Sequence, residues 1–324
     1  MVPKIYLFGD SITEQSFQNG YWGAALANHF VGKADVVVRG FSGYNTRWAL
    51  KEIDRVFPEA EHGGDPLAVT VFFGANDACL PDRYAFFQHV PLPEYKQNLT
   101  AIFAFIKKRW PSTLVVFITP PPIDEEARIL KPYVDNPSGL PERTNEAAGL
   151  YAEQCLAAAA ECGAPAIDIW KKMQENPSWE KEFLNDGLHL SEKGNKIVLD
   201  SVIEKLGEAN INIDTLKPQL PTFDDIMEFV FFRWIESQLV FPLGSQEGKC
   251  DVISLKCLLR SSALFWPPPI VVALKNLAKG PDASNVHSGE LFAVAIASMR
   301  DSLGLPDLHS SASLGFSLFF DEVS

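Results

Sequence analysis

The chain has 324 residues, of which 47% are hydrophobic and 21% charged, and these proportions are ordinary for a globular protein. Its formal net charge of −13 argues against a nucleic-acid partner, because phosphate binding needs a basic surface. The five cysteines are irregularly spaced and include no Cys-x-x-Cys pair, so they indicate neither a disulfide framework nor a zinc site.

The N-terminal residues resemble neither a signal peptide nor a membrane anchor. Met1-Val2-Pro3-Lys4 leads straight into a short apolar segment, without a long hydrophobic stretch or a cleavage site. The apolar segment 226–243 contains Glu228, Arg233 and Glu236, which argues against a spanning helix. We therefore expect a cytoplasmic protein without an integral membrane segment.

Five short apolar segments alternate with helical patterns over the first two thirds of the chain. Continuous apolar runs of this length are typical of strands that are buried on both faces of a parallel sheet. The predicted strands are Ile5–Phe8, Val36–Val38, Ala68–Phe73, Leu114–Ile118 and Ala166–Ile169.

The helices between these strands have recognisable ends. Apolar residues recur at helical spacing from Tyr95 to Trp110, where a proline follows. Thr144 can cap an Ala-rich helix that Gly163 terminates, and Ser191 can cap a final amphipathic helix. The alternation predicts an α/β protein with three layers, α/β/α, around a five-stranded parallel sheet with right-handed crossovers.

The pattern changes near the end of this region. Residues 226–324 contain 14 serines against 8 in all the residues before them, and the alternation of strands and helices stops. We predict a domain over 1–225 and an extension over 226–324. The extension is either poorly ordered, a partner-binding segment, or a translated stretch foreign to the natural protein, such as a mis-spliced 3′ end, which we favour. Alternatively, 226–243 packs as an extra helix over the sheet or the mouth of the site.

A serine directly follows the first predicted strand. Gly9-Asp10-Ser11 places a hydroxyl on the turn at the carboxyl edge of the sheet, where open α/β sheets bind ligands. Asp and Ser are also common turn residues, so this motif alone is weak evidence for a nucleophile.

A histidine with a nearby carboxylate precedes the last helix. The chain has six histidines: His29, His62, His89, His189, His287 and His309. His189 follows Asp186 by three residues across a Gly-containing turn, so the carboxylate can reach Nδ1 and direct Nε2 towards a serine. A capped helix start is the alternative interpretation of Asp-x-x-His.

Two further loops offer hydrogen-bond donors for an oxyanion. Gly43, after the second strand, can present a backbone N–H with no side chain in the way. Asn76, after the third strand, can donate its side-chain amide, although Gly-x-Asn-Asp is also a common turn. The backbone N–H of Ser11 is a third candidate donor.

Taken together, these motifs resemble the SGNH/GDSL hydrolase superfamily, which is named for its Ser, Gly, Asn and His. Within it the chain looks like the isoamyl-acetate-hydrolysing esterase group, with its plant GDSL esterase/lipase members. The matching motifs are Phe8-Gly9-Asp10-Ser11-Ile12-Thr13-Glu14, Arg39-Gly40-Phe41-Ser42-Gly43-Tyr44-Asn45-Thr46, Phe73-Gly74-Ala75-Asn76-Asp77-Ala78 and Asp186-Gly187-Leu188-His189-Leu190-Ser191. The resemblance covers about residues 3–225, and it implies the flavodoxin-like SGNH fold.

The resemblance also implies roles for these residues. Ser11 is the expected nucleophile, His189 the base and Asp186 its orienting carboxylate, while Gly43, Asn76 and the Ser11 amide form the oxyanion hole. The expected reaction is hydrolysis of short-chain, acetate-type carboxylic esters through an acyl-serine, as part of lipid metabolism, without metal or cofactor.

Other functions stay open on the sequence. A carbohydrate O-deacetylase or a thioesterase would use the same residues, and a catalytically idle binding module would share the fold. A nucleotide- or phosphate-binding domain is disfavoured because neither Gly-x-Gly-x-x-Gly nor the Walker pattern occurs. The natural ester, its acyl-chain length and the oligomeric state do not follow from the sequence.

Overall fold

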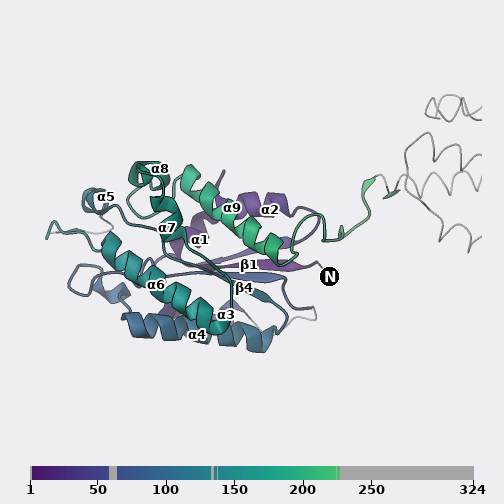
Figure 1. Cartoon of the computed structure of the whole chain (residues 1–324), viewed down its shortest axis with the longest axis horizontal. Helices are drawn as coiled ribbons and strands as arrows, with labels where there is room; N and C mark the ends of the chain where they lie inside the picture. The colour runs from purple at the N-terminus through teal and green to yellow at the C-terminus, as the bar shows by residue number, and fades with distance from the viewer. Residues whose placement is uncertain (1, 58–63, 133–134, 137, 224, 227–324) are drawn as a thin grey trace, which may run out of the picture. The chain divides into compact units, whose positions relative to one another are not determined.

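The computed structural model describes residues 2–57, 64–132, 135–136, 138–223 and 225–226. In these residues five parallel strands form one sheet, in the order β2-β1-β3-β4-β5 (Figure 1). The strands are β1 (Lys4–Gly9), β2 (Asp35–Gly40), β3 (Ala68–Phe72), β4 (Leu114–Ile118) and β5 (Ala166–Ile167). The predicted five-stranded parallel sheet is confirmed.

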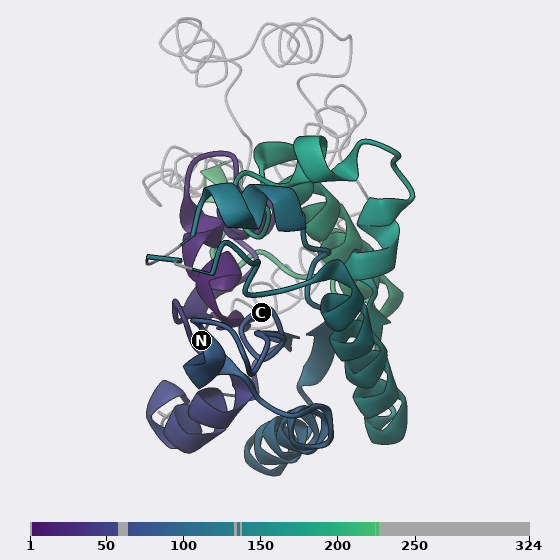
Figure 2. The ribbon, with the colours of Figure 1, turned by 90° about the vertical axis from the view of Figure 1, so that its left-hand side faces the viewer.

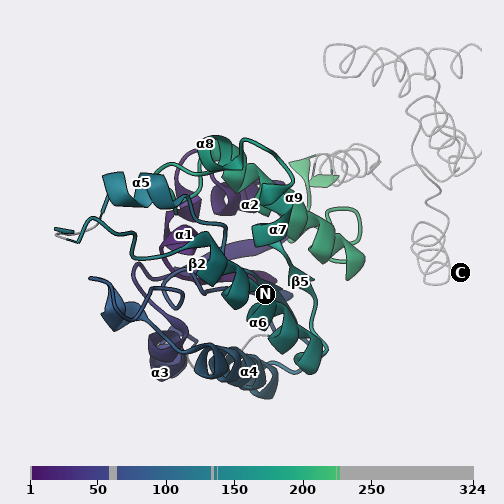
Figure 3. The same cartoon turned by 60° about the vertical axis from the view of Figure 1, so that its left-hand side comes forward.

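Helices cover both faces of this sheet. One face packs against α2, α7 and α9, and the other against α3, α4 and α6 (Figures 1 and 3). The helices are α1 (Ser11–Glu14), α2 (Trp22–His29), α3 (Thr46–Val56), α4 (Leu92–Arg109), α5 (Glu125–Leu130), α6 (Asn145–Cys162), α7 (Ile169–Gln174), α8 (Trp179–Phe183) and α9 (Glu192–Glu208), with short 3-10 turns at Gln15–Phe17 and Phe86–Gln88. The three-layer α/β/α prediction is therefore confirmed.

The continuous apolar strands follow from this double burial. Leu7 and Phe8 are adjacent in β1 and both fully buried, yet they belong to separate hydrophobic clusters on the two faces of the sheet. Side chains alternate between the faces of a strand, so a strand covered on both faces needs apolar residues at every position.

The predicted helix ends are also present. The Thr144 hydroxyl accepts a hydrogen bond from the Ala147 N–H at 3.1 Å, and the Ser191 hydroxyl accepts one from the Gly194 N–H at 3.2 Å. Gly163 ends α6 in the left-handed conformation, with φ of 63°.

The last strand is shorter than the predicted Ala166–Ile169. The Asp168 side chain accepts a hydrogen bond from the Lys171 N–H at 3.0 Å and caps α7, so Ile169 is the first residue of a helix. Two short helices, α7 and α8, therefore lie between β5 and the loop that contains His189.

Figure 2 faces the edge of the sheet at which the carboxyl ends of the strands lie. Gly9 at the end of β1 pairs with Gly40 of β2 and with Phe72 of β3. The segments after these three strands therefore begin side by side, and they contain Ser11 at the start of α1 and Gly43 and Asn76 in loops.

The predicted extension over 226–324, apart from its first residue Ile226, lies outside the described residues, and so does the rest of the suggested helix over 226–243. Among the residues that the structure describes, no helix has the length and apolarity to cross a membrane.

Candidate active site

Ser11 occupies the first turn of α1, directly after β1. Asp10 caps this helix, since its carboxylate accepts a hydrogen bond from the Ile12 N–H at 3.0 Å. The cap fixes the backbone on either side of Ser11, whose exposure is 8%. The hydroxyl is thus held at the rim of the sheet and lies just within reach of a ligand.

His189 lies on a short, tightly bonded loop before α9. The Asn185 N–H donates to the His189 carbonyl at 2.8 Å, and the flanking Leu188 and Leu190 are buried. Asp186 Oδ1 accepts hydrogen bonds from the Leu188 N–H at 3.0 Å and the His189 N–H at 2.8 Å. The loop geometry therefore brings the carboxylate beneath the imidazole.

Ser11, His189 and Asp186 form one hydrogen-bonded row. Ser11 Oγ lies 3.0 Å from His189 Nε2, and His189 Nδ1 lies 2.8 Å from Asp186 Oδ2. Burial alone would raise the pKa of Asp186, but hydrogen bonds from His189 and its charge hold that pKa well below its ordinary value. A carboxylate that stays ionised keeps Nδ1 protonated, which leaves Nε2 as an acceptor for the serine proton.

Gly43 and Asn76 are joined to each other by Gln88. Gln88 Nε2 donates to the Gly43 carbonyl at 3.0 Å and to Asn76 Oδ1 at 3.2 Å. Gly43 has a φ of 79°, in the left-handed region that favours glycine. Asn76 Nδ2 donates one N–H to the Tyr44 carbonyl at 2.8 Å, and the amide group carries a second N–H.

These donors and the serine follow adjacent strands, which gives the site the parts that acyl transfer needs. A hydroxyl is hydrogen-bonded to a base, and N–H groups lie on the two neighbouring loops. The sequence profile of the GDSL-like lipase/acylhydrolase family matches residues 7–197, more than half of the chain. The chain belongs to this family.

Relatives of this GDSL hydrolase are named as esterases. It is 61% identical over 228 residues to a GDSL esterase/lipase of Arabidopsis thaliana (At5g45920), an alignment covering 70% of this chain and 95% of the relative. It is 43% identical over 230 residues to the isoamyl acetate-hydrolyzing esterase 1 homolog of Bos taurus, with 70% and 89% covered. The chain is accordingly a carboxylic ester hydrolase.

A solved structure agrees with the fold. The lipase/acylhydrolase from Enterococcus faecalis is 25% identical, with a TM-score of 0.50, and the match covers 68% of this chain and all of that one.

The site of this hydrolase also includes residues that the sequence analysis missed. Gln88 is a buried polar residue that contacts two loops, and its sequence context contains no motif that would indicate this role. Three charged side chains beside the site, Arg128, Glu142 and Arg143, are fully buried. Their sequence positions resemble ordinary surface positions, and no local signal would have found them.

Two buried carboxyl groups next to Ser11 and Asn76 have raised pKa values. Burial raises the pKa of Asp10 to about 6 and that of Asp77 to about 7. Asp77 Oδ1 accepts the Thr46 N–H at 2.9 Å, so this carboxyl connects the loop after β3 to the start of α3. Both groups thus shape the loops that contain Ser11 and Asn76.

The other histidines of the described residues are not part of the row formed by Ser11, His189 and Asp186. His29 packs its ring edgewise against Phe30, and His89 Nδ1 lies 2.6 Å from the Cys79 carbonyl; His62, His287 and His309 lie outside the described residues. Within the described part of the chain, no group of three or more His, Cys, Asp or Glu side chains could hold a metal ion.

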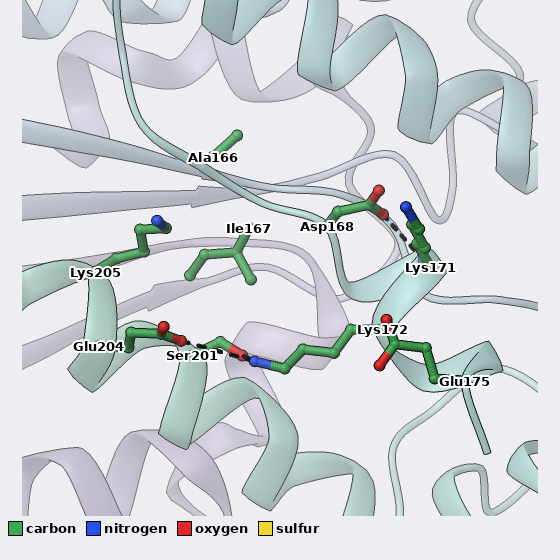
Figure 4. Close-up of a pocket in the computed structure, with 9 residues that line it drawn as sticks. All are labelled: Ala166, Ile167, Asp168, Lys171, Lys172, Glu175, Ser201, Glu204 and Lys205. Atoms are coloured by element: carbon green, nitrogen blue, oxygen red, sulfur yellow. Dashed lines mark hydrogen bonds and ion pairs between the residues drawn. The ribbon is translucent and has the colours of Figure 1, made fainter.

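A separate open hollow of about 280 Å³ lies between β5, α7 and α9 (Figure 4). In it Lys172 Nζ donates to Ser201 Oγ at 2.8 Å and lies 3.8 Å from Glu204 Oε2. None of the predicted site residues lines it.

Proposed function

We propose that this hydrolase cleaves short-chain, acetate-type carboxylic esters through an acyl-serine intermediate. The observation that carries the proposal is the row from Ser11 Oγ through His189 to Asp186, with distances of 3.0 and 2.8 Å. In it Ser11 is the nucleophile, His189 the general base and then acid, and Asp186 the group that orients and stabilises the imidazolium.

The first half-reaction transfers the acyl group to the enzyme. Ser11 Oγ attacks the ester carbonyl carbon while its proton moves to His189 Nε2. The carbonyl oxygen becomes an oxyanion, which accepts hydrogen bonds from the backbone N–H of Ser11 and Gly43 and from Asn76 Nδ2. The C–O bond then breaks, and the departing alkoxide takes the proton from His189.

The second half-reaction regenerates the serine. Water attacks the acyl-serine carbon and gives its proton to His189, and the same donors stabilise the second tetrahedral intermediate. The bond from carbon to Ser11 Oγ breaks, the serine regains the proton from His189, and the carboxylic acid leaves.

The acyl-chain preference is supported by a relative. The bovine protein that is 43% identical is named for hydrolysis of isoamyl acetate, an ester of a two-carbon acid. A panel of p-nitrophenyl esters from C2 to C16 tests the proposal, with the highest kcat/KM expected at C2 to C4. A maximum at C10 or beyond would contradict it, and a preference for acetylated sugars or thioesters over alcohol esters would favour a deacetylase or a thioesterase.

Replacing Asn76 with alanine separates oxyanion stabilisation from substrate binding. We expect kcat to fall by roughly 10²-fold or more with little change in KM, because the lost hydrogen bond forms mainly in the transition state. Steady-state kinetics on p-nitrophenyl acetate measure both constants. A change confined to KM would place Asn76 in the substrate pocket instead.

The remaining proposals concern the surroundings of the enzyme. We place it in the cytoplasm, acting on small-molecule esters of lipid metabolism without a nucleic-acid partner. The buried, unpaired thiols of Cys79 and Cys155 fit a reducing compartment. Imaging of a fluorescent fusion tests the location, and secretion into the medium would contradict it.

Residues 226–324 are proposed to be dispensable for catalysis. The alignment to the Arabidopsis relative covers 95% of that protein but 70% of this chain, and all the elements described here end by residue 226. A chain ending at Asp225 should retain the kcat/KM and the melting temperature of the full chain. Insoluble protein or a changed acyl-chain preference would show that the extension belongs to the working enzyme.

A further inference from the structure

Three charged side chains are buried together in the segment between β4 and α6. Arg128 and Arg143 both donate to one oxygen of Glu142: Arg128 Nε lies 2.8 Å from Glu142 Oε1, and Arg143 Nη1 lies 2.6 Å from it. All three side chains have no exposed surface. Removing charges from water costs free energy, so each of the two arginines needs well-placed hydrogen-bond partners.

At one end, Arg128 holds the loop of His189. Its Nη1 donates to the Asp186 carbonyl at 3.0 Å and to Asp186 Oδ2 at 3.2 Å. Oδ2 is the oxygen that faces His189 Nδ1. The loop also approaches the start of α5 closely: the Asp124 N–H donates to the Gly187 carbonyl at 3.0 Å, and a Cβ at Gly187 would lie 2.4 Å from the Asp124 carbonyl oxygen.

At the other end, Arg143 holds the loop of Asn76. Its Nη2 donates to Asn76 Oδ1 at 2.9 Å and to Gln88 Oε1 at 3.1 Å, and its Nε donates to the Ala75 carbonyl at 2.7 Å. Gln88 extends this contact to the Gly43 carbonyl. One guanidinium is therefore bonded directly to the Asn76 loop and, through Gln88, is connected to the Gly43 loop, and these two loops supply oxyanion donors.

Arg143 helps to set the orientation of the Asn76 amide, together with Gln88, which donates to Oδ1, and the Tyr44 carbonyl, which accepts from Nδ2. A guanidinium has only donors, so it must face Oδ1 of the amide and not Nδ2. Nδ2 is then directed away from Arg143. Without this cation, only Gln88 and the Tyr44 carbonyl hold the amide. A rotated amide would present its carbonyl oxygen to the substrate, and the negative end of that dipole would oppose the developing oxyanion.

We propose that Arg128, Glu142 and Arg143 form a positioning bridge that holds the Asp186 carboxylate and the Asn76 amide in their working orientations. This inference rests on the proposed function, because it assumes that both groups act on the ester. With Asp186 included, the bridge holds two positive and two negative charges, so it adds no net charge to the interior.

The double variant Glu142→Gln/Arg143→Met tests the part of the bridge in which Arg143 holds the Asn76 amide. It removes one charge of each sign and leaves Arg128 paired with Asp186, so the interior stays balanced and folding is favoured. We expect kcat on p-nitrophenyl acetate to fall roughly 10- to 100-fold with KM changed less than about twofold, as for loss of an oxyanion donor. Arg143→Lys should keep the ion pair with Glu142 and a melting temperature close to that of the wild type. It should nevertheless show a similar loss of kcat, since one ammonium group cannot make all the hydrogen bonds of the planar guanidinium.

Replacing Arg128, which holds the Asp186 carboxylate, should instead change the pH dependence of kcat/KM. His189 is hydrogen-bonded to Ser11 and to the Asp186 carboxylate, which in turn faces the cation of Arg128, and it interacts electrostatically with the Asp10 carboxyl. In Arg128→Met the Asp186 charge loses its compensation and stabilises the imidazolium more strongly. The acid limb of the kcat/KM profile should therefore move to higher pH.

Arg109→Gln is the matched control, because Arg109 lies at the far end of α4 in a surface ion pair with Asp54 at 3.1 Å. It should leave kcat and the pH profile unchanged. A folded double variant with the kcat of the wild type, or an Arg128→Met profile that does not move, would overturn the proposal. Failure of the proposed function is distinguishable, since the unmodified enzyme would then show no hydrolysis that depends on Ser11.

Discussion

Replacing Ser11 with alanine is expected to lower kcat/KM for p-nitrophenyl acetate by roughly 10⁴-fold or more. The acyl group then has no atom to which it can transfer, and the remaining donors can act only on direct attack by water. The fold should persist, because residue 11 lies in the first turn of α1 and alanine suits a helix.

Labelling with a fluorophosphonate supplies a second measurement. The wild-type enzyme should be modified at Ser11, and Ser11→Ala should not be modified at all. Circular dichroism and the melting temperature serve as controls for folding. A well-folded variant that keeps most of its activity would remove Ser11 from the mechanism.

Replacing His189 with alanine should cost about as much as losing Ser11. The hydroxyl, the imidazole and the carboxylate act as a unit, so removing one member leaves the others without a partner. Asp186→Asn should cost as much or less, since it weakens control of the imidazole tautomer but leaves the base in place.

His29→Ala is the control for this pair, because His29 ends α2 and contacts Phe30 rather than Ser11. It should retain wild-type turnover. Near-normal kcat in His189→Ala, together with inactivity on replacing His29 or His89, would require a different base.

Much of the fold could be predicted because its signals are local. Each strand contains a short, mostly apolar run, and the caps at Thr144 and Ser191 bond to N–H groups three residues away. The shortening of β5 is an exception. There Asp168 began a helix within an apolar segment, and a two-residue strand leaves little periodicity to detect.

The contacts of the active site can likewise be divided into local ones and ones between distant residues. Asp186 and His189 are three residues apart, so their contact follows from one turn and was predictable. Ser11 and His189 are 178 residues apart, and their approach was predictable only because parallel strands end at one edge of a sheet.

The sequence by itself thus determined the layers, the strands and the residues that meet at the carboxyl edge. The tertiary structure alone decided how these residues are held. Arg143 reaches Asn76 across 67 residues, and Arg128 reaches Asp186 across 58. Arg143 also pairs with its neighbour Glu142, but the contacts of the two arginines with Asn76 and Asp186 join distant segments, and only packing brings those groups together.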